Sequence, residues 1–225
     1  MRIKHFGIFK NEMNQLNWEA LRNDKTEDSY FLPYTRQEYL LRFDINEPSA
    51  STQVILRGIE KTGLKKIFSI GSGIASQEYQ LKKFSGNVVV VSDYNKSVLR
   101  LKQFNIFDDA LIVDAFHDPL PVDQNWVILF PRIDTEFDDT QLNKLFGKCR
   151  SSGVNNICFI PAELLSLRII VAEMKTLVTS IIKRKPRVFC GYARSMSSFK
   201  KIWDPYYKLS EKYTTGKPIF FLQAK

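Results

Sequence analysis

Residues 67–78 read Ile67-Phe68-Ser69-Ile70-Gly71-Ser72-Gly73-Ile74-Ala75-Ser76-Gln77-Glu78. A short apolar run leads into Gly71 and Gly73, and Ser76 then stands where it would cap a helix. Glycine lets the backbone turn tightly and approach a ligand closely, and the free N–H groups at the start of a helix favour anionic groups. The pattern therefore predicts a strand, a glycine turn and a helix that together bind a polar ligand.

An acidic residue follows this turn at the end of the next apolar run. The next apolar run, residues 87–92, ends at Asp93, which stands twenty positions after Gly73. An acid at the end of a second strand is placed to accept hydrogen bonds from ribose hydroxyls, so turn and acid together predict a nucleoside-cofactor site. The alternative is that Asp93 only caps the helix predicted over 96–104. A further acid, Asp114, follows the third apolar run.

Short apolar runs rich in β-branched and aromatic residues alternate along the chain with segments whose apolar residues recur every three or four positions. The predicted strands span 65–70, 87–92, 110–113, 126–130, 157–160, 187–193 and 218–223. The predicted helices span 51–61, 76–84, 96–104, 140–149 and 163–183. This alternation is typical of an α/β fold with a doubly wound, mostly parallel sheet, here of seven strands.

Three segments need separate interpretations. The helix over 163–183 carries an apolar stripe, which we expect to cover a face of the sheet. Residues 197–213 are predicted to be helical or irregular. Residues 1–50 do not fit the strand–helix repeat and are interpreted as an N-terminal extension or lid, in which Tyr34 belongs to an aromatic segment, beside a main domain over 51–225.

Composition and charge limit the class of protein. The 225 residues are 44% hydrophobic and 25% charged, which excludes a disordered chain. The net charge of +9 lies entirely in residues 183–225, which hold eleven Lys and Arg against two acids. Such a segment suits nucleic acid, anionic lipid or a phosphorylated substrate, unless it is only a solvated basic face.

Other features concern the compartment. Cys149, Cys158 and Cys190 are an odd number without metal-ligand spacing, so we expect neither a disulfide framework nor a metal site. Lys10 interrupts the start too early for a secretion signal, and charges such as Glu173 make the segment 163–183 unsuited to crossing a lipid bilayer. We therefore expect a cytoplasmic protein without a membrane partner.

From residue 65 to about 160 the chain resembles the class I S-adenosylmethionine-dependent methyltransferases. That family usually reads acid-x-Gly-x-Gly-x-Gly at the first turn, where this chain has Ser69 in place of the acid and Ala75 in place of the last glycine. The resemblance implies a Rossmann-like sheet with an antiparallel last strand and S-adenosylmethionine as cofactor. A dinucleotide site is disfavoured, because the full Gly-x-Gly-x-x-Gly would need glycine at Ser76.

The resemblance also implies residue roles. The expected cofactor-binding residues are Ser69, Gly71, Ser72, Gly73, Asp93, Tyr94, Asp114, Ala115 and Pro131. Asp93 would hold the ribose hydroxyls, Tyr94 would pack on adenine, and Asp114 with Ala115 would read its edge. The residues after the fourth strand, from Pro131 on, fall where the family places those nearest the transferred methyl.

Acceptor binding and catalysis are predicted from position. Asp134 and Glu136 follow the fourth strand and are the candidate general bases, ahead of His117. Arg132, Tyr34 and Arg194 are the candidate substrate-binding residues. The predicted reaction is methyl transfer to O or N of a small or medium-sized anionic acceptor, for instance a phosphorylated one. The alternatives are an RNA methyltransferase that uses the basic C-terminal segment, and a non-catalytic cofactor-binding relative.

Overall fold

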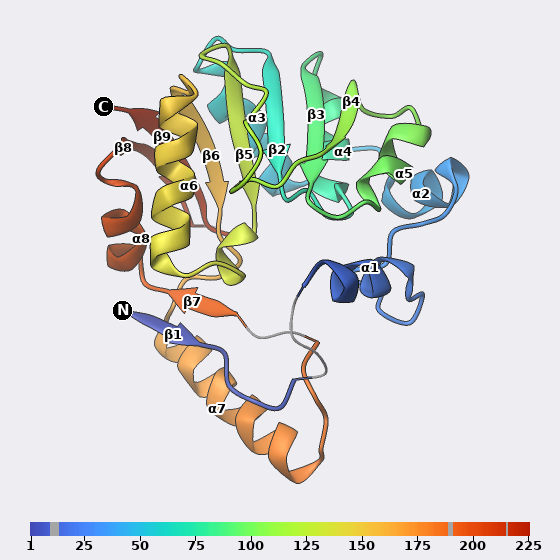
Figure 1. Cartoon of the computed structure of the whole chain (residues 1–225), viewed down its shortest axis with the longest axis vertical. Helices are drawn as coiled ribbons and strands as arrows, with labels where there is room; N and C mark the ends of the chain where they lie inside the picture. Colours follow the sequence, from blue (N-terminus) through green and yellow to red (C-terminus); the bar gives the residue numbers. More distant parts are fainter. Residues whose placement is uncertain (10–13, 189–190, 215) are drawn as a thin grey trace.

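The computed structural model describes residues 1–9, 14–188, 191–214 and 216–225, and its centre is a seven-stranded sheet (Figure 1). In spatial order the strands are β4 (Asp109–Ile112), β3 (Val88–Asp93), β2 (Lys66–Ile70), β5 (Trp126–Pro131), β6 (Asn156–Ile160), β9 (Ile219–Ala224) and β8 (Tyr207–Tyr213). All neighbours from β4 to β6 are parallel, whereas β9 runs antiparallel to both β6 and β8. The predicted fold class is confirmed.

The inner strands are apolar along their whole length because helices cover both faces of the sheet. In β3 the run of four valines illustrates this: Val90 belongs to the hydrophobic core on one face, and Val89 and Val91 to the core on the other. β-branched side chains suit such a strand, since their restricted rotamers fit a pleated, packed surface.

Two helical layers enclose the sheet (Figure 1). One core is closed by α6 (Asp139–Ser151) and α8 (Met196–Trp203), where Phe146, Phe159 and Trp203 pack edge to face. The other is closed by α2 (Arg36–Phe43), α3 (Ala50–Glu60), α4 (Ser76–Phe84) and α5 (Val98–Gln103). The predicted helices over 51–61, 76–84, 96–104 and 140–149 therefore lie where the apolar spacing placed them.

The C-terminal strands differ from the prediction. Residues 197–213, expected to be helical or irregular, form α8 followed by the edge strand β8, whose mostly exposed or half-buried side chains include Lys208, Glu211 and Lys212. Charged side chains at a sheet edge hide the apolar alternation that identifies a strand. The strand predicted over 187–193 is wrong as a member of the main sheet. Its described part reaches β7 (Tyr192–Arg194), which pairs with β1 (Arg2–Lys4) in a separate two-stranded sheet, and residues 189–190 lie outside the described residues, as does Cys190.

The helix α7 (Leu167–Ile182) does not cover the sheet as predicted. It lies beside β1 and β7, away from the seven strands (Figure 1), and its buried residues are Glu173 and Ser180. The predicted apolar stripe is instead exposed, with Leu167 at 82% and Val171 at 68%. Within the described part of the chain, no helix is both long and apolar enough to cross a membrane.

Candidate functional site

The glycine turn after β2 is a left-handed backbone segment. Gly71 and Gly73 have φ of 71° and 60°, and Ala75 has φ of 54°. Such angles are rarely adopted by residues with a side chain, and a Cβ on Gly73 would also lie 2.7 Å from Nη2 of Arg22. The turn ends in α4, whose N-cap is Ala75 without a side-chain hydrogen bond, so the predicted capping by Ser76 is wrong. The N–H groups at the start of α4 thus receive no cap from the Ala75 side chain.

Asp93 lies at the end of β3 and is bonded to this turn. Its Oδ2 accepts a 3.0 Å hydrogen bond from the backbone N–H of Gly73, and its Oδ1 accepts one of 2.9 Å from the N–H of Asn95. Burial raises the pKa of Asp93, while the Arg22 guanidinium and these two N–H donors act in the opposite direction. The carboxylate keeps lone pairs beyond the two it uses, so it can accept further hydrogen bonds.

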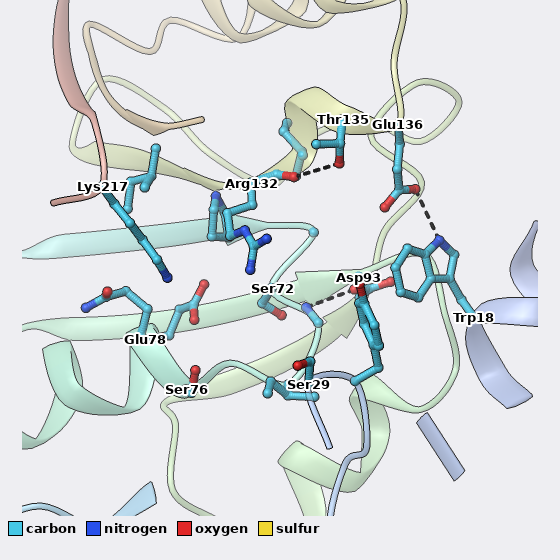
Figure 2. A pocket seen from close by; sticks show the side chains of 18 of the residues that line it. Trp18, Ser29, Ser72, Ser76, Glu78, Asp93, Arg132, Thr135, Glu136 and Lys217 are labelled. Atoms are coloured by element: carbon cyan, nitrogen blue, oxygen red, sulfur yellow. Dashed lines mark hydrogen bonds between the residues drawn. The ribbon is translucent and has the colours of Figure 1, made fainter. Parts of the chain in front are cut away.

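A cavity of about 450 Å³ opens over the turn and over the carboxyl ends of β2, β3 and β5 (Figure 2). Its lining includes eight residues predicted to bind cofactor or substrate or to act as base: Gly71, Ser72, Gly73, Asp93, Tyr94, Pro131, Arg132 and Glu136. Ser72 is buried there, and its hydroxyl has no hydrogen-bond partner among the described residues. We refer to this space as the turn cavity.

A second cavity of about 450 Å³ shares Gly71, Tyr94 and Glu136 with the turn cavity and extends to Asp114 and Ala115. Asp114 accepts hydrogen bonds from Nδ1 of His117 at 2.8 Å and from its neighbouring backbone. Partial burial acts to raise the pKa of Asp114, but these hydrogen bonds outweigh it and lower the pKa. The predicted adenine-reading pair therefore lies beside the turn cavity, with Asp114 held as a carboxylate.

The two predicted bases are placed differently. Glu136 lines both cavities, and its Oε2 accepts a 3.2 Å hydrogen bond from Nε1 of Trp18 in α1 (Gln15–Asn23), as Figure 2 shows. Burial, helped by the charge of Asp93, raises the pKa of Glu136 to about 7. Asp134, in the short 3-10 helix Ile133–Thr135, is fully buried and lines neither cavity, and its Oδ1 accepts from the N–H of Ala162 at 2.8 Å. The geometry favours Glu136 over Asp134.

Three further predicted residues, besides Asp134, line neither cavity. Arg194 is completely buried and holds Asp139 by a 2.8 Å ion pair and the carbonyls of Asp134 and Phe137 by its other nitrogens. Tyr34 is 47% exposed and donates to the carbonyl of Asn23. Neither lines either of these two cavities, so the substrate contacts predicted for Arg194 and Tyr34 stay predictions that the cavity linings do not support. The third, Ser69, is buried beneath the turn.

The basic C-terminal segment also contributes less than predicted. Lys200 and Lys201 are exposed on α8, and Arg187 pairs with Glu173 at 2.6 Å. None of these three lines either cavity. Among the described residues of that segment, only Lys217 reaches the turn cavity, where it faces the same space as Arg132 (Figure 2). The excess charge is therefore not gathered in either cavity.

Glu78 and Arg22 are site residues that the sequence reasoning missed. Glu78 is 1% exposed, lines the turn cavity, and accepts a 2.6 Å hydrogen bond from the hydroxyl of Ser69; burial raises its pKa to about 7. Arg22 is 8% exposed and extends from α1 over the ring of Trp18 to the turn. Burial lowers the pKa of Arg22, while Asp93 and Glu136 act to raise it. The available signal for Glu78 was its position on the first turn of the helix after the glycines.

Solved methyltransferases share this fold. Human N-acetylserotonin methyltransferase in complex with SAM aligns with a TM-score of 0.64 and 14% identity, over 92% of this chain and 58% of its own. The mitomycin 7-O-methyltransferase MmcR aligns at 0.59 and 14% identity, over 93% and 60%. Magnesium protoporphyrin IX methyltransferase from Synechocystis PCC 6803, with bound SAH, aligns at 0.58 and 11% identity, over 93% of each chain.

This chain therefore has the fold of the class I SAM-dependent methyltransferases. It spans about 60% of the length of the first two proteins. No protein-family model and no curated protein matches it in sequence.

Proposed function

We propose that this protein is an S-adenosylmethionine-dependent methyltransferase that acts on O or N of a small or medium-sized anionic acceptor. The observation that carries the proposal is the hydrogen bond from the backbone N–H of Gly73 to the carboxylate of Asp93, two residues that line the turn cavity. It joins the predicted ribose acceptor to the predicted glycine turn, at the strand ends where doubly wound sheets bind their ligands. Fold neighbours solved with SAM or SAH bound support the same cofactor.

The residues present fit such a cofactor. Asp93 keeps lone pairs for the ribose hydroxyls, and the buried hydroxyl of Ser72 has no partner in the described part of the chain, which a polar ligand would supply. Tyr94 reaches both cavities, which suits a side chain that packs on adenine between Asp93 and the pair Asp114 and Ala115. Arg22 lies against Gly73 and offers a cation to the carboxylate at the amino-acid end.

Glu78 takes the place of the family's leading acid in this proposal. The acid is absent at Ser69, but the Ser69 hydroxyl donates to Glu78, whose carboxyl lines the turn cavity from α4. A buried carboxyl of raised pKa becomes a carboxylate readily when a cation enters beside it, because the opposite charge offsets the cost of burial. The α-ammonium of the cofactor is such a cation.

Methyl transfer needs orientation of the acceptor and removal of one proton. When bound, the cofactor would supply a methyl group on a sulfonium sulfur for transfer to an acceptor oxygen or nitrogen, leaving a thioether, and the protein would mainly have to orient the acceptor. Glu136 lines both cavities and is placed to take the proton that the acceptor O–H or N–H loses. Arg132 and Lys217 provide positive charge for an anionic acceptor.

A thermal-shift series tests the cofactor class. A ligand that binds only the native state stabilises it by about 2.7 kcal/mol at a hundredfold excess over Kd. We expect S-adenosylmethionine and S-adenosylhomocysteine to raise the Tm and NAD to leave it unchanged. A shift with NAD alone would point to a dinucleotide site instead. Shifts with both sulfur ligands, but no methyl transfer to any anionic acceptor, would indicate a cofactor-binding relative.

A further inference from the structure

The exposed side of α7 is a continuous apolar seam. Five of its large side chains are exposed by 49–82% and follow one another at alternating steps of four and three residues: Leu167, Val171, Met174, Val178 and Ile181. This spacing places them along one line of a helix, as at the contact positions of a coiled coil. Ile182, 74% exposed, borders the end of the line. We name these six residues the α7 seam.

The side of α7 that faces the rest of the protein is attached by two buried polar side chains, beside half-buried apolar ones. Glu173 accepts hydrogen bonds from Nη1 of Arg187 at 2.6 Å and from the N–H of Phe6 at 3.0 Å. The Ser180 hydroxyl accepts from the N–H of Ile8 at 3.3 Å. The helix thus directs polar side chains at its own protein and leaves the α7 seam in solvent, and an exposed apolar patch of this kind marks an interaction surface.

Charge around the seam is almost entirely positive. Five exposed bases, Arg168, Lys175, Lys183, Arg184 and Lys185, form no ion pair among the described residues. Three of them directly follow a seam residue, so long basic side chains border the apolar line. The acids between 163 and 187 are Glu163 and Glu173, and Glu173 is already paired with Arg187.

We propose that α7 lies flat on an anionic phospholipid surface, with its seam in the boundary between headgroups and acyl chains and its bases on lipid phosphates. Apolar burial and attraction of lysines and arginines to anionic lipid together hold such interfacial helices, and basic side chains reach outward along their apolar stems. Sixteen residues extend for about 24 Å, enough to lie along the surface. This proposal does not depend on methyl transfer.

A second copy of the chain is the alternative partner for the α7 seam, but repulsion between like charges disfavours it. The seam spacing would suit a pair of α7 helices, but pairing would bring together ten unpaired bases and leave two Glu163 side chains to offset them. Like charges beside a helix pair are destabilising. An anionic surface satisfies all five bases of each chain. The absence of a membrane partner, expected from the sequence, rested on charges such as Glu173 that disfavour crossing a bilayer, whereas the exposed seam suits a helix that lies on the surface.

Vesicle flotation of the full chain tests the proposal. We compare phosphatidylcholine vesicles with vesicles that also contain phosphatidylglycerol, and expect binding to the second kind. Replacing Lys175 and Lys183 by Gln should weaken binding about 25-fold, because each base near an anionic surface contributes about fivefold. Val171→Gln with Val178→Gln should weaken it about tenfold or more through lost apolar burial. The matched control, Lys200→Gln with Lys201→Gln on exposed α8, should bind like the unchanged chain.

Three results would overturn the proposal: no binding to anionic vesicles, equal binding to both kinds of vesicle, or equal loss in the α8 control and the α7 variant. Sedimentation of the chain without lipid identifies the competitor. A dimer that Val171→Gln with Val178→Gln converts to a monomer would assign the seam to a second copy. Unchanged Tm values across the variants show that each protein is folded, since all the substituted side chains are exposed.

Discussion

The hydroxyl of Ser69 donates a 2.6 Å hydrogen bond to Oε1 of Glu78, and both residues are fully or almost fully buried. Ser69 carries no charge at the position where the class I methyltransferase motif usually has its leading acid. The partner on α4 brings a carboxyl group back to the same corner of the turn cavity. Under the proposed function, Glu78 would supply from α4 the carboxyl group that the motif position itself lacks.

The pH dependence of stability and of cofactor binding tests Glu78. Its pKa is about 7 in the folded protein and 4.5 for an ordinary glutamate, so the folded state holds more protons between these values. Stability without ligand should fall as pH rises from about 4.5 to 7 and level off above. Glu78→Gln should lessen that fall in a Tm series. Affinity for S-adenosylmethionine should increase through pH 7, and the variant should lose this increase.

Asp93→Ala should leave the fold intact and weaken S-adenosylmethionine binding by about 1.5–3 kcal/mol, the range for hydrogen bonds to a charged group. Isothermal titration measures the change. Asp109→Ala is the matched control, because Asp109 pairs with Lys102 at the start of β4 and lines neither cavity. If both variants bind S-adenosylmethionine with the same affinity, Asp93 does not contact the cofactor.

Alanine substitutions at Gly73 and Gly63 distinguish the effect of backbone strain on stability from the effect of a side chain on ligand binding. Their φ angles are +60° and +72°, so an alanine at either costs about 1–2 kcal/mol of stability. A Cβ at Gly63 meets nothing within 4 Å, whereas at Gly73 it enters the turn cavity beside Arg22. We expect similar losses of Tm but a loss of cofactor binding only in Gly73→Ala. If Gly73→Ala binds the cofactor as tightly as the unchanged protein, the glycine loop serves only as a turn and does not contact the cofactor.

Glu136→Gln and Asp134→Asn distinguish the two candidate bases. Glu136→Gln should lower kcat by about 10²- to 10⁴-fold, the usual contribution of a general base, with little effect on cofactor affinity. Asp134→Asn should leave kcat nearly unchanged, since Asp134 faces the N–H of Ala162 and neither cavity. Steady-state kinetics with one acceptor measure both. A larger loss of kcat in Asp134→Asn than in Glu136→Gln would identify Asp134 as the general base.

The sheet was predictable where burial on both sides left a simple pattern. The valines of β3 and the glycine turn after β2 identify their elements locally. The edge strand β8 was missed because its charged, exposed side chains carry no apolar alternation. Helix α7 was recognised as a helix but assigned the wrong surroundings, since a periodic stripe does not tell whether protein, lipid or a second chain covers it.

The candidate site was predictable to the extent that it follows the strand ends. Asp93 ends β3, while Gly73 and Glu136 lie in the segments that follow β2 and β5, and the topology of the sheet brings the three together. Arg22 was not predictable, because α1 reaches the turn from far away in sequence. The surroundings of Arg194, predicted to bind substrate, were not predictable either, because the carbonyls of Asp134 and Phe137 that it contacts lie far from it in sequence.

The pairing of β1 with β7 sets an order of events during protein synthesis. Arg2 is in register with Arg194, and the ammonium group of Met1 donates to the Ser195 hydroxyl at 2.8 Å. Residues 2–4 therefore cannot pair until residues 192–194 have been synthesised. The contacts of β2, α4 and β3 are local and can form early, whereas contacts between distant residues form slowly. The two-stranded sheet that seats α7 thus closes late, as do β8 and β9, which follow β7 in the chain.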